Sequence, residues 1–312
     1  MNGSGAGPGG YPVHVLQPQL VRKLIDVYGD TGREWIDAFP ATLERVRRRW
    51  GLRLGETFAY VGYAYVVRAE LPGGTPVVLK LAPPDKELVS EAAALRHYDG
   101  RGVCRLLDAD DTVVALLLER LDPGETLATL EDDTAATEIA ATVMTRLFRP
   151  LPADHAFPTI ERWGQAFERV RERYGGSGGS FPPELFEPAS RLYFDLCASQ
   201  AEPVLLHGDL HHYNILSATR EPWLAIDPKG LAGEPAYEIG PYLYNRLDAG
   251  PDIQALTLRR IEQFAGVLGF DRQRLIGWAF AQSVLSAVWT FEDHGSIGEP
   301  RLALPRALAG LI

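Results

Sequence analysis

The sequence predicts an α+β fold in two parts, a small lobe built on a β-sheet and a larger helical lobe. Three observations support this prediction. Aromatic and β-branched segments typical of strands fill residues 52–119, a charged stretch with a Pro-Gly turn follows at 119–126, and apolar residues at helical spacing dominate the remainder. We therefore expect a small lobe over 17–118, a hinge linker at 119–126, and a helical lobe over 127–312.

The small lobe is expected to begin with helices and to continue as a sheet of about five strands. Apolar residues between 17 and 50 recur at helical spacing in separate pieces, which predicts leading helices that cap this lobe. Farther along, strand-like runs flank a Leu-Pro-Gly-Gly turn at 71–74, as in a hairpin. The expected segments are the strands 58–69 and 76–81, the helix 86–98, and the strands 104–107 and 112–118. Their order, β-β-α-β-β, indicates an α+β lobe.

The large lobe is expected to be mainly helical. Apolar residues recur at helical spacing in five segments, at 132–148, 160–174, 185–199, 252–268 and 272–291. The sequence GGSGGSFPP at 175–183 separates two of them, and its composition predicts a flexible loop. Such a loop is either a lid over a site or a surface insertion, and we favour the insertion.

The composition narrows the class of partner. The 312 residues are 46% hydrophobic and carry a formal net charge of −10, so the chain can bury one large core or two modest ones. Proteins that bind nucleic acid normally present a basic face, which argues against a nucleic-acid partner. The acidic balance matches a small cationic ligand, although acidity that serves only solubility explains it equally well.

We expect a cytoplasmic protein without a membrane-spanning segment. No apolar run approaches the roughly 18 residues that span a bilayer, and the Gly-rich N-terminus lacks the basic and apolar regions of a signal peptide. Residues 1–16 are expected to be disordered. Cys104 and Cys197 lie far apart among apolar residues, which favours core packing over a disulfide or a catalytic thiol. The oligomeric state stays open, with a monomer favoured.

The stretch most indicative of chemistry runs from His207 to Asp227. Asp209 and Asn214 are five residues apart, and Asp227 follows the strand-like run 223–226. Phosphoryl transfer from a nucleotide requires a carboxylate beside the transferred group, with an amide and a second carboxylate on Mg²⁺. This spacing therefore predicts a phosphotransfer site.

One competing interpretation is a hydrolytic metal site. His207, Asp209, His211 and His212 form an H-x-D-x-H-H pattern, and imidazole with carboxylate suits Zn²⁺ or Fe. Such a site needs further ligands for which the chain offers no second local cluster, and it leaves Asn214 unexplained. For His207 itself a hydrogen bond that braces the turn is favoured, while His211 and His212 remain without an assigned role.

A lysine upstream supports the phosphotransfer interpretation. Lys80 ends an apolar strand-like run, and Glu91 follows eleven residues later in the expected helix. A strand lysine paired with a helix glutamate can hold the α- and β-phosphates of ATP while its charge stays satisfied. Glu87 is an alternative partner. An isolated lysine at the end of a strand would be assigned to the surface. The phosphate-binding role of Lys80 is supported only because the candidate metal-binding stretch, 207–227, lies downstream.

These residues carry a family resemblance. VVLK at Lys80, SEAAAL at Glu91, LLLER before the linker, HGDLHHYN at 207–214 and AIDPK at 225–229 resemble aminoglycoside phosphotransferases of the protein-kinase-like superfamily. PWLAIDPKGLAGEPAYEIG (222–240) and WTFEDHG (289–295) are similar to the streptomycin 6-phosphotransferase and hydroxyurea phosphotransferase branch. The resemblance covers roughly residues 40 to 300 and implies a two-lobed protein-kinase-like fold.

The resemblance implies roles for the central residues. Lys80 would contact the α- and β-phosphates, and Glu91 would fix Lys80. Asp209 would occupy the position of the catalytic base, where it accepts the proton of the substrate hydroxyl or orients that hydroxyl. Asn214 and Asp227 would be Mg²⁺ ligands. ATP is the expected nucleotide, with GTP not excluded.

The nucleotide-binding part of the resemblance is less complete. Backbone groups of Glu119 and Leu121 would meet the adenine edge. The expected phosphate loop, FAYVGYAYV at 58–66, holds the single glycine Gly62 and no G-x-G-x-x-G motif. Gly208 stands where regulated protein kinases carry an arginine, which suggests a constitutively assembled site.

The acceptor is expected to be a small molecule. The stretch after Asp227 is short and broken by Gly and Pro, unlike a platform for a protein substrate. An aminoglycoside such as streptomycin is the leading acceptor, and hydroxyurea, choline, an amino alcohol or a sugar are alternatives. A nucleotide-binding protein without catalysis is an alternative of another class. Four acids could face a cationic substrate or be solvated surface: Glu234, Glu238, Glu292 and Asp293.

Overall fold

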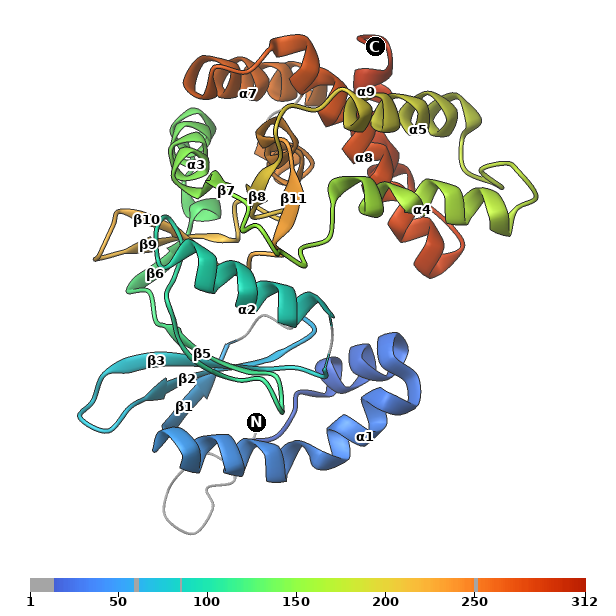
Figure 1. Cartoon of the computed structure of the whole chain (residues 1–312). Coiled ribbons are helices and arrows are strands. Elements are labelled where there is room, and N and C mark those ends of the chain that lie inside the picture. Colours follow the sequence, from blue (N-terminus) through green and yellow to red (C-terminus); the bar gives the residue numbers. More distant parts are fainter. Residues whose placement is uncertain (1–13, 59–61, 85, 250–251) are drawn as a thin grey trace. The chain divides into compact units, whose positions relative to one another are not determined.

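The chain divides into two compact units. One consists of residues 1–100 and 104–121, and the other of residues 101–103 and 122–312. The computed structural model describes residues 14–58, 62–84, 86–249 and 252–312 (Figure 1). Of the segment 1–16, for which the sequence predicts disorder, residues 1–13 lie outside this description.

The first unit is built on a five-stranded antiparallel sheet with the strand order β1-β2-β3-β5-β4. Its strands are β1 (Arg53–Thr57), β2 (Tyr65–Glu70), β3 (Pro76–Leu81), β4 (Leu106–Asp110) and β5 (Ala115–Glu119). The four strands placed from the sequence correspond to β2, β3, β4 and β5, although β2 begins at Tyr65 and not at residue 58. The fifth strand is β1, so the order along the chain is β-β-β-α-β-β. Its sequence, RLGET, is too polar to indicate a strand, and its strand conformation comes from pairing with β2.

Helix α1 (Pro18–Trp50) covers one face of this sheet (Figure 1). It consists of two helical parts that meet in a kink at Gly29, where φ is 56° and ψ is −124°, so the prediction of separate leading helices is confirmed. Its buried side chains, among them Leu24, Phe39 and Val46, pack against Val67 and other inward-facing residues of the sheet. Because side chains alternate along a strand, the face opposite α1 is left for other contacts.

The predicted helix of the first unit is confirmed as α2 (Lys86–Tyr98). The preceding strand β3 points Leu79 and Leu81 toward the α1 core, so Lys80 points to the other face. Glu91 of α2 meets Lys80 there. The alternation of side chains along β3 is therefore enough to place Lys80 on the face that α2 covers.

The second unit contains two small antiparallel sheets of three strands each, with the orders β10-β9-β6 and β11-β8-β7. The strands are β6 (Pro123–Thr126), β7 (Arg149–Pro150), β8 (Val204–Leu206), β9 (Ile215–Ala218), β10 (Trp223–Ala225) and β11 (Leu231–Gly233). Strands β8 and β9 enclose residues 207–214, and β10 ends two residues before Asp227. The small sheets therefore fix both sides of the stretch singled out in the sequence.

Helices make up most of the second unit, as the periodicity predicts (Figure 1). They are α3 (Asp133–Leu147), α4 (Ile160–Arg173), α5 (Pro183–Ala198), α6 (Gly240–Leu243), α7 (Ile253–Leu268), α8 (Arg272–His294) and α9 (Glu299–Ala309), with short 3₁₀ helices η1 (Leu127–Thr129), η2 (Pro235–Ile239) and η3 (Leu247–Ala249). The five predicted helices correspond to α3, α4, α5, α7 and α8. Helix α9 was missed because Pro300 and Pro305 interrupt its pattern.

Capping side chains explain why four of these helices begin where they do. The side chain of Asp132 accepts hydrogen bonds from the backbone N–H groups of Thr134 and Ala135. The same bonding satisfies the first N–H groups of α4, α7 and α8. The capping residues of those helices are Thr159, Asp252 and Asp271.

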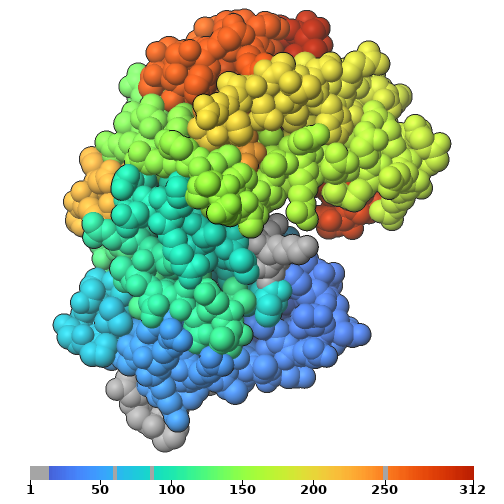
Figure 2. Space-filling model, in the orientation of Figure 1, coloured from blue at the N-terminus to red at the C-terminus, as the bar shows by residue number. Residues whose placement is uncertain are grey.

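The connection between α4 and α5 lies on the surface of the second unit (Figure 2), but one of its side chains is deeply buried. Phe181 is 1% exposed and packs edge-on or tilted against Phe186 of α5 and Phe291 of α8. Tyr174 stacks on the same Phe291 ring. This aromatic anchor gives the segment 175–183 a fixed attachment. No helix among the described residues is long and apolar enough to cross a membrane.

We expect Phe181→Ala to destabilise the second unit by about 3–5 kcal/mol, because it removes a buried ring and leaves a cavity. The measurement is the free energy of unfolding in urea, followed by tryptophan fluorescence. Ser180→Ala, at an exposed neighbouring position, serves as the matched control and should change it by about 0.5 kcal/mol or less. Equal effects of both substitutions would contradict the anchor.

Candidate active site

Residues 207–214 form a loop between β8 and β9 that we call the catalytic loop. One buried carboxyl holds its first turn. Glu238 of η2, fully buried, accepts hydrogen bonds from the backbone N–H of His207 at 2.7 Å and of Gly208 at 3.0 Å. Each oxygen of the carboxyl takes one of the two bonds. A side chain 30 residues away in sequence thus fixes the backbone that leads to Asp209.

Two opposing effects act on Glu238. Burial disfavours its charged form and raises the pKa of this carboxyl to about 8. The backbone N–H groups of Gly208, His207 and Leu210 pull the pKa in the other direction, because they stabilise the carboxylate. The backbone of the catalytic loop is therefore held by a carboxyl, that of Glu238, whose pKa lies close to neutral pH.

His207 braces the same turn, as its sequence context suggests. Its Nδ1 accepts the backbone N–H of Asp209 at 3.3 Å, so the proton of the neutral ring lies on Nε2, which donates to the carbonyl of Ile226 at 2.9 Å. The ring is fully buried, and this burial lowers its pKa to about 3. His207 is thus a neutral bridge between the loop and the chain just before Asp227.

The glycine at 208 has a local structural reason. Gly208 has φ 82°, in the left-handed region that favours glycine. A Cβ at this position would lie 2.8 Å from the side chain of Leu231 in β11. The tight turn between His207 and Asp209 therefore leaves no room for a side chain.

The strand pairing brings Asn214 and Asp227 to the same end of a hairpin. Ala225 of β10 pairs with Ile215 of β9, and the backbone N–H of Ile226 donates to the carbonyl of Asn214 at 2.9 Å. The side-chain Nδ2 of Asn214 donates to the backbone carbonyl of Asp209 at 2.9 Å. The loop and the hairpin therefore gather the three polar residues that the spacing singled out.

This donor set fits Mg²⁺. Because Nδ2 of Asn214 is used by the loop, its Oδ1 is the atom left to face a metal ion. Asp227 lies in the left-handed region with φ 63°, which is uncommon for a residue other than glycine and is often found at functional sites. One amide and one carboxylate oxygen, completed by phosphates and water, are the ligands typical of Mg²⁺ in phosphotransfer sites.

The metal site of a hydrolase finds no support. Among the residues that the structure describes, no group of three or more His, Cys, Asp or Glu side chains could hold a metal ion. His211 is half-buried and His212 is buried, and burial lowers their pKa values to about 4 and about 3. The ring of His212 stacks on the ring of Tyr242 at 3.9 Å between centroids.

In the first unit, Lys80 and Glu91 form the predicted pair. Lys80 Nζ lies 2.7 Å from Glu91 Oε2, and the two side chains are only 12% and 5% exposed. Glu87, the alternative partner, precedes Glu91 in α2. The buried pair keeps the ammonium group oriented on the sheet face opposite α1.

The residues expected to meet the nucleotide base lie at the end of β5. The carboxyl of Glu119 accepts the backbone N–H of Arg105 at 2.9 Å, and its own N–H donates to the carbonyl of Arg105. Leu121, 9% exposed, is the last residue of the first unit. Gly62 lies in a bend before β2, while residues 59–61 of the expected phosphate loop lie outside the described residues. The nucleotide contacts of Glu119, Leu121 and Gly62 stay a prediction.

The four acids expected on the substrate side have different environments. Glu234, 3% exposed, pairs with Arg274 at 2.8 Å and accepts from the indole N–H of Trp278, so together with Glu238 it is used inside the fold. Glu292 forms a bidentate pair with Arg169 at 2.8 and 2.9 Å, and Asp293 next to it is exposed. Of these four acids, Glu292 and Asp293 at the end of α8 are the two whose side chains reach the surface.

Comparison with known proteins identifies the family. Residues 55–295 match the model of the aminoglycoside/hydroxyurea antibiotic resistance kinases. The chain belongs to this family. It is therefore a kinase that transfers phosphoryl groups to small molecules, and the resemblance found in its motifs is confirmed.

Relatives of this kinase cover nearly its whole length. It is 37% identical to "Streptomycin 6-kinase" of Streptomyces glaucescens, over 96% of this chain and 98% of the relative. It is 35% identical to "Hydroxyurea phosphotransferase" of Kitasatospora aureofaciens, over 95% and 86%. A second "Streptomycin 6-kinase", from Streptomyces griseus, is 34% identical over 90% and 92%.

Solved structures confirm the predicted protein-kinase-like fold. A choline/ethanolamine kinase family protein from Mesorhizobium loti matches with a TM-score of 0.58 and 13% identity, over 83% of this kinase and 86% of that chain. A thermostable mutant of the aminoglycoside phosphotransferase APH(4)-Ia, in complex with ADP and hygromycin B, matches with a TM-score of 0.57 and 14% identity, over 85% and 97%. At such identities the likeness shows the fold alone.

Sequence reasoning missed residues that hold the loop from a distance. Glu238 was assigned to the substrate side, yet its contacts are with the loop backbone. Asp133, Tyr242 and Arg260 received no role, although they pack behind His212. A usable signal was the helical spacing that puts Arg260 on the same face of α7 as Leu256 and Phe264, since an arginine on a buried face needs a partner.

The depressed pKa of His207 predicts a specific loss of stability in acid. The unfolded chain takes up a proton below the ordinary pKa of about 6.5, whereas the folded ring stays neutral down to about pH 3. This stabilisation is therefore present above pH 6.5 and is lost as the pH falls. Between pH 7 and pH 5 the free energy of unfolding should fall by about 2 kcal/mol more than in His207→Gln, which cannot titrate. Urea unfolding of both proteins at the two pH values measures the difference, and equal losses would contradict the assignment.

Proposed function

We propose that this kinase transfers the γ-phosphoryl group of ATP to a hydroxyl of an aminoglycoside, with streptomycin as its substrate. The observation that carries the proposal is the identity of 37% and 34% to two proteins named streptomycin 6-kinase, each over at least 90% of both chains. The hydroxyl at position 6 is accordingly the proposed acceptor. GTP is the alternative phosphoryl donor.

The catalytic loop supplies Asp209, the carboxylate that orients and deprotonates the attacking hydroxyl. Asp209 is partly exposed, with 30% of its side chain accessible, and its backbone is held through His207 and Glu238. In the proposed reaction, ATP + R–OH gives ADP + R–O–PO₃²⁻ + H⁺, and Asp209 orients the hydroxyl and accepts its proton. The bond formed joins the substrate oxygen to phosphorus, and the bond broken joins that phosphorus to the β-phosphate oxygen of ATP.

Charge stabilisation is the second requirement of this reaction. Asn214 and Asp227 would hold Mg²⁺, which supplies positive charge to the phosphates when it is bound. Lys80, oriented by Glu91 at 2.7 Å, adds a fixed ammonium group for the α- and β-phosphates. Such fixed charges stabilise the transition state because they need little reorganisation during the reaction.

The acceptor site is proposed on the second unit, near the end of α8. Glu292 and Asp293 present carboxylates there, and the half-buried rings of Trp163 and Trp289 pack edge to face nearby on α4 and α8. Carboxylates and aromatic faces both attract cations. This chemistry suits the guanidinium groups of streptomycin better than a neutral acceptor.

Hydroxyurea is the second candidate acceptor. The relative named hydroxyurea phosphotransferase is 35% identical over 95% of the chain, so overall identity hardly separates the two. Hydroxyurea is small and uncharged, so it would offer no cation to Asp293 at the end of α8.

The test measures ADP release with Mg-ATP in the presence of streptomycin, hydroxyurea or choline, one at a time. We expect streptomycin-dependent release, with phosphate at the 6-hydroxyl by NMR of the product. Asp209→Ala should lower the rate by at least about 10²- to 10³-fold, because the group that handles the nucleophile is lost. Replacing ATP with GTP in the same assay identifies the donor.

The outcomes separate the candidates. Release with hydroxyurea alone would assign that acceptor and overturn the streptomycin proposal. Nucleotide binding without turnover on any hydroxyl compound would point to a binding protein. Activity of Asp209→Ala near that of the parent would contradict the mechanism.

A further inference from the structure

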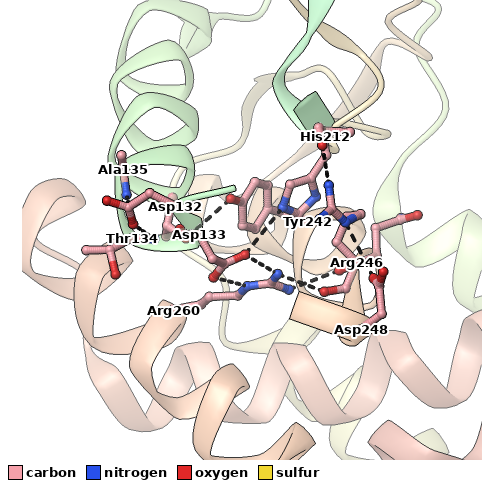
Figure 3. A network of polar contacts seen from close by, with 12 residues as sticks. Asp132, Asp133, Thr134, Ala135, His212, Tyr242, Arg246, Asp248 and Arg260 are labelled. Atoms are coloured by element: carbon pink, nitrogen blue, oxygen red, sulfur yellow. Dashed lines mark hydrogen bonds and ion pairs between the residues drawn. The ribbon is translucent and has the colours of Figure 1, made fainter. Parts of the chain in front are cut away.

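Besides Glu238, a second buried cluster supports the catalytic loop, at its far end. Arg260 of α7 is fully buried and pairs with Asp133 at the start of α3 (Figure 3). Its Nε lies 3.0 Å from Oδ2 of Asp133 and its Nη2 lies 2.5 Å from Oδ1. The remaining donors reach the backbone carbonyls of Asn245 at 2.9 Å and Arg246 at 3.0 Å. Four of the five N–H groups of the guanidinium are therefore used, which holds it in one orientation.

An aromatic ring links this ion pair to the loop. The guanidinium of Arg260 lies 5.3 Å from the ring centroid of Tyr242. The hydroxyl of Tyr242 is held by Thr137 of α3 at 3.2 Å. The Tyr242 ring also stacks on His212, with an interplanar angle of 23°. The ion pair, the tyrosine and the loop histidine therefore form one continuous packed cluster (Figure 3).

The contacts of His212 indicate how its ring is used. The residue is 2% exposed, and neither ring nitrogen has a hydrogen-bond partner among the described residues. Its backbone carbonyl accepts the N–H of Ala128 at 3.2 Å, and the carbonyl of Ala128 accepts a bond from Arg246. The ring thus contributes a flat stacking surface. The backbone of His212 is linked through Ala128 to Arg246, whose own carbonyl accepts a bond from Arg260.

We propose that the Asp133–Arg260 pair, acting through Tyr242 and His212, is a positioning element that sets Asn214 for the metal ion. Asn214 follows His212 by two residues, and its backbone N–H donates to the carbonyl of His211 at 2.9 Å. A shift of His212 therefore moves the amide that faces the metal. The inference rests on the proposed role of this loop in phosphoryl transfer.

The arrangement fits positioning better than plain stabilisation. A buried ion pair contributes little to stability compared with apolar packing, because both charges lose their hydration. It does impose a definite geometry, since the fork of an arginine fits a carboxylate in few orientations. Here that geometry joins α3, α7 and the turn after α6 behind a single loop residue.

Two substitutions of His212 provide the sharpest test. In His212→Ala the stacking surface is lost, so kcat should fall and the Mg²⁺ concentration for half-maximal rate should rise, each by about 10- to 100-fold. The KM for streptomycin should change by less than about 3-fold, because the acceptor contacts lie elsewhere. His212→Phe restores a flat ring without ring nitrogens, and its values should lie much closer to those of the parent than to those of His212→Ala.

The ion pair itself has a matched control in the neighbouring arginine. Arg259 also contacts Asp133, at 2.5 Å, but it is 38% exposed and its other partners are Thr134 and Gln263 rather than the loop. Arg260→Gln should reproduce the rise in the Mg²⁺ requirement, whereas Arg259→Gln should leave it within about 3-fold of the parent. Circular dichroism and thermal unfolding show which variants are folded at the assay temperature.

Mg²⁺-dependent binding of ADP, measured by calorimetry, gives a second readout that needs no acceptor. If the parent phosphorylates none of the acceptors, the proposed function fails, and the binding measurement still tests the positioning. Folded His212→Ala with the parent's Mg²⁺ dependence would overturn the inference. So would His212→Phe that behaves like His212→Ala, since a ring surface would then not be the cause.

Discussion

The structure of the catalytic loop, residues 207–214, depends on one buried carboxyl. Glu238 offers an oxygen to each of two consecutive backbone N–H groups, those of His207 and Gly208. These bonds set the turn at Gly208, where φ is 82° and a side chain would collide with Leu231. Asp209 is the next residue. A catalytic carboxylate is useful only in a fixed place, because positioning and electrostatics account for most of the rate of phosphoryl transfer.

From this turn the loop is fixed step by step. Neutral His207 bridges Asp209 and Ile226, and Asn214 returns a bond to the carbonyl of Asp209. The cluster of Asp133, Arg260 and Tyr242 behind His212 supports the far end. The same unit therefore uses backbone hydrogen bonds at one end of the loop and aromatic stacking at the other.

The sequence could predict what is local and could not predict what depends on distant contacts. The helical period places α3, α4, α5, α7 and α8 within a few residues of their observed bounds, since each buries one apolar stripe. It missed β1, whose strand character comes from pairing with β2, and α9, whose prolines resemble a break. In the site, five-residue spacing already places Asp209 and Asn214 in one turn. The bracing by Glu238 joins residues 30 positions apart, and no local pattern records it.

Because two acceptor oxygens at position 238 hold the catalytic loop, Glu238→Gln should displace it. The glutamine keeps the size of the side chain but offers one oxygen, so its NH₂ group must face a backbone N–H. The measurement is kcat for streptomycin phosphorylation by the folded variant, with circular dichroism and thermal unfolding as the check on folding. We expect kcat to fall by about 10- to 100-fold. A folded Glu238→Gln protein with the kcat of the parent would contradict it.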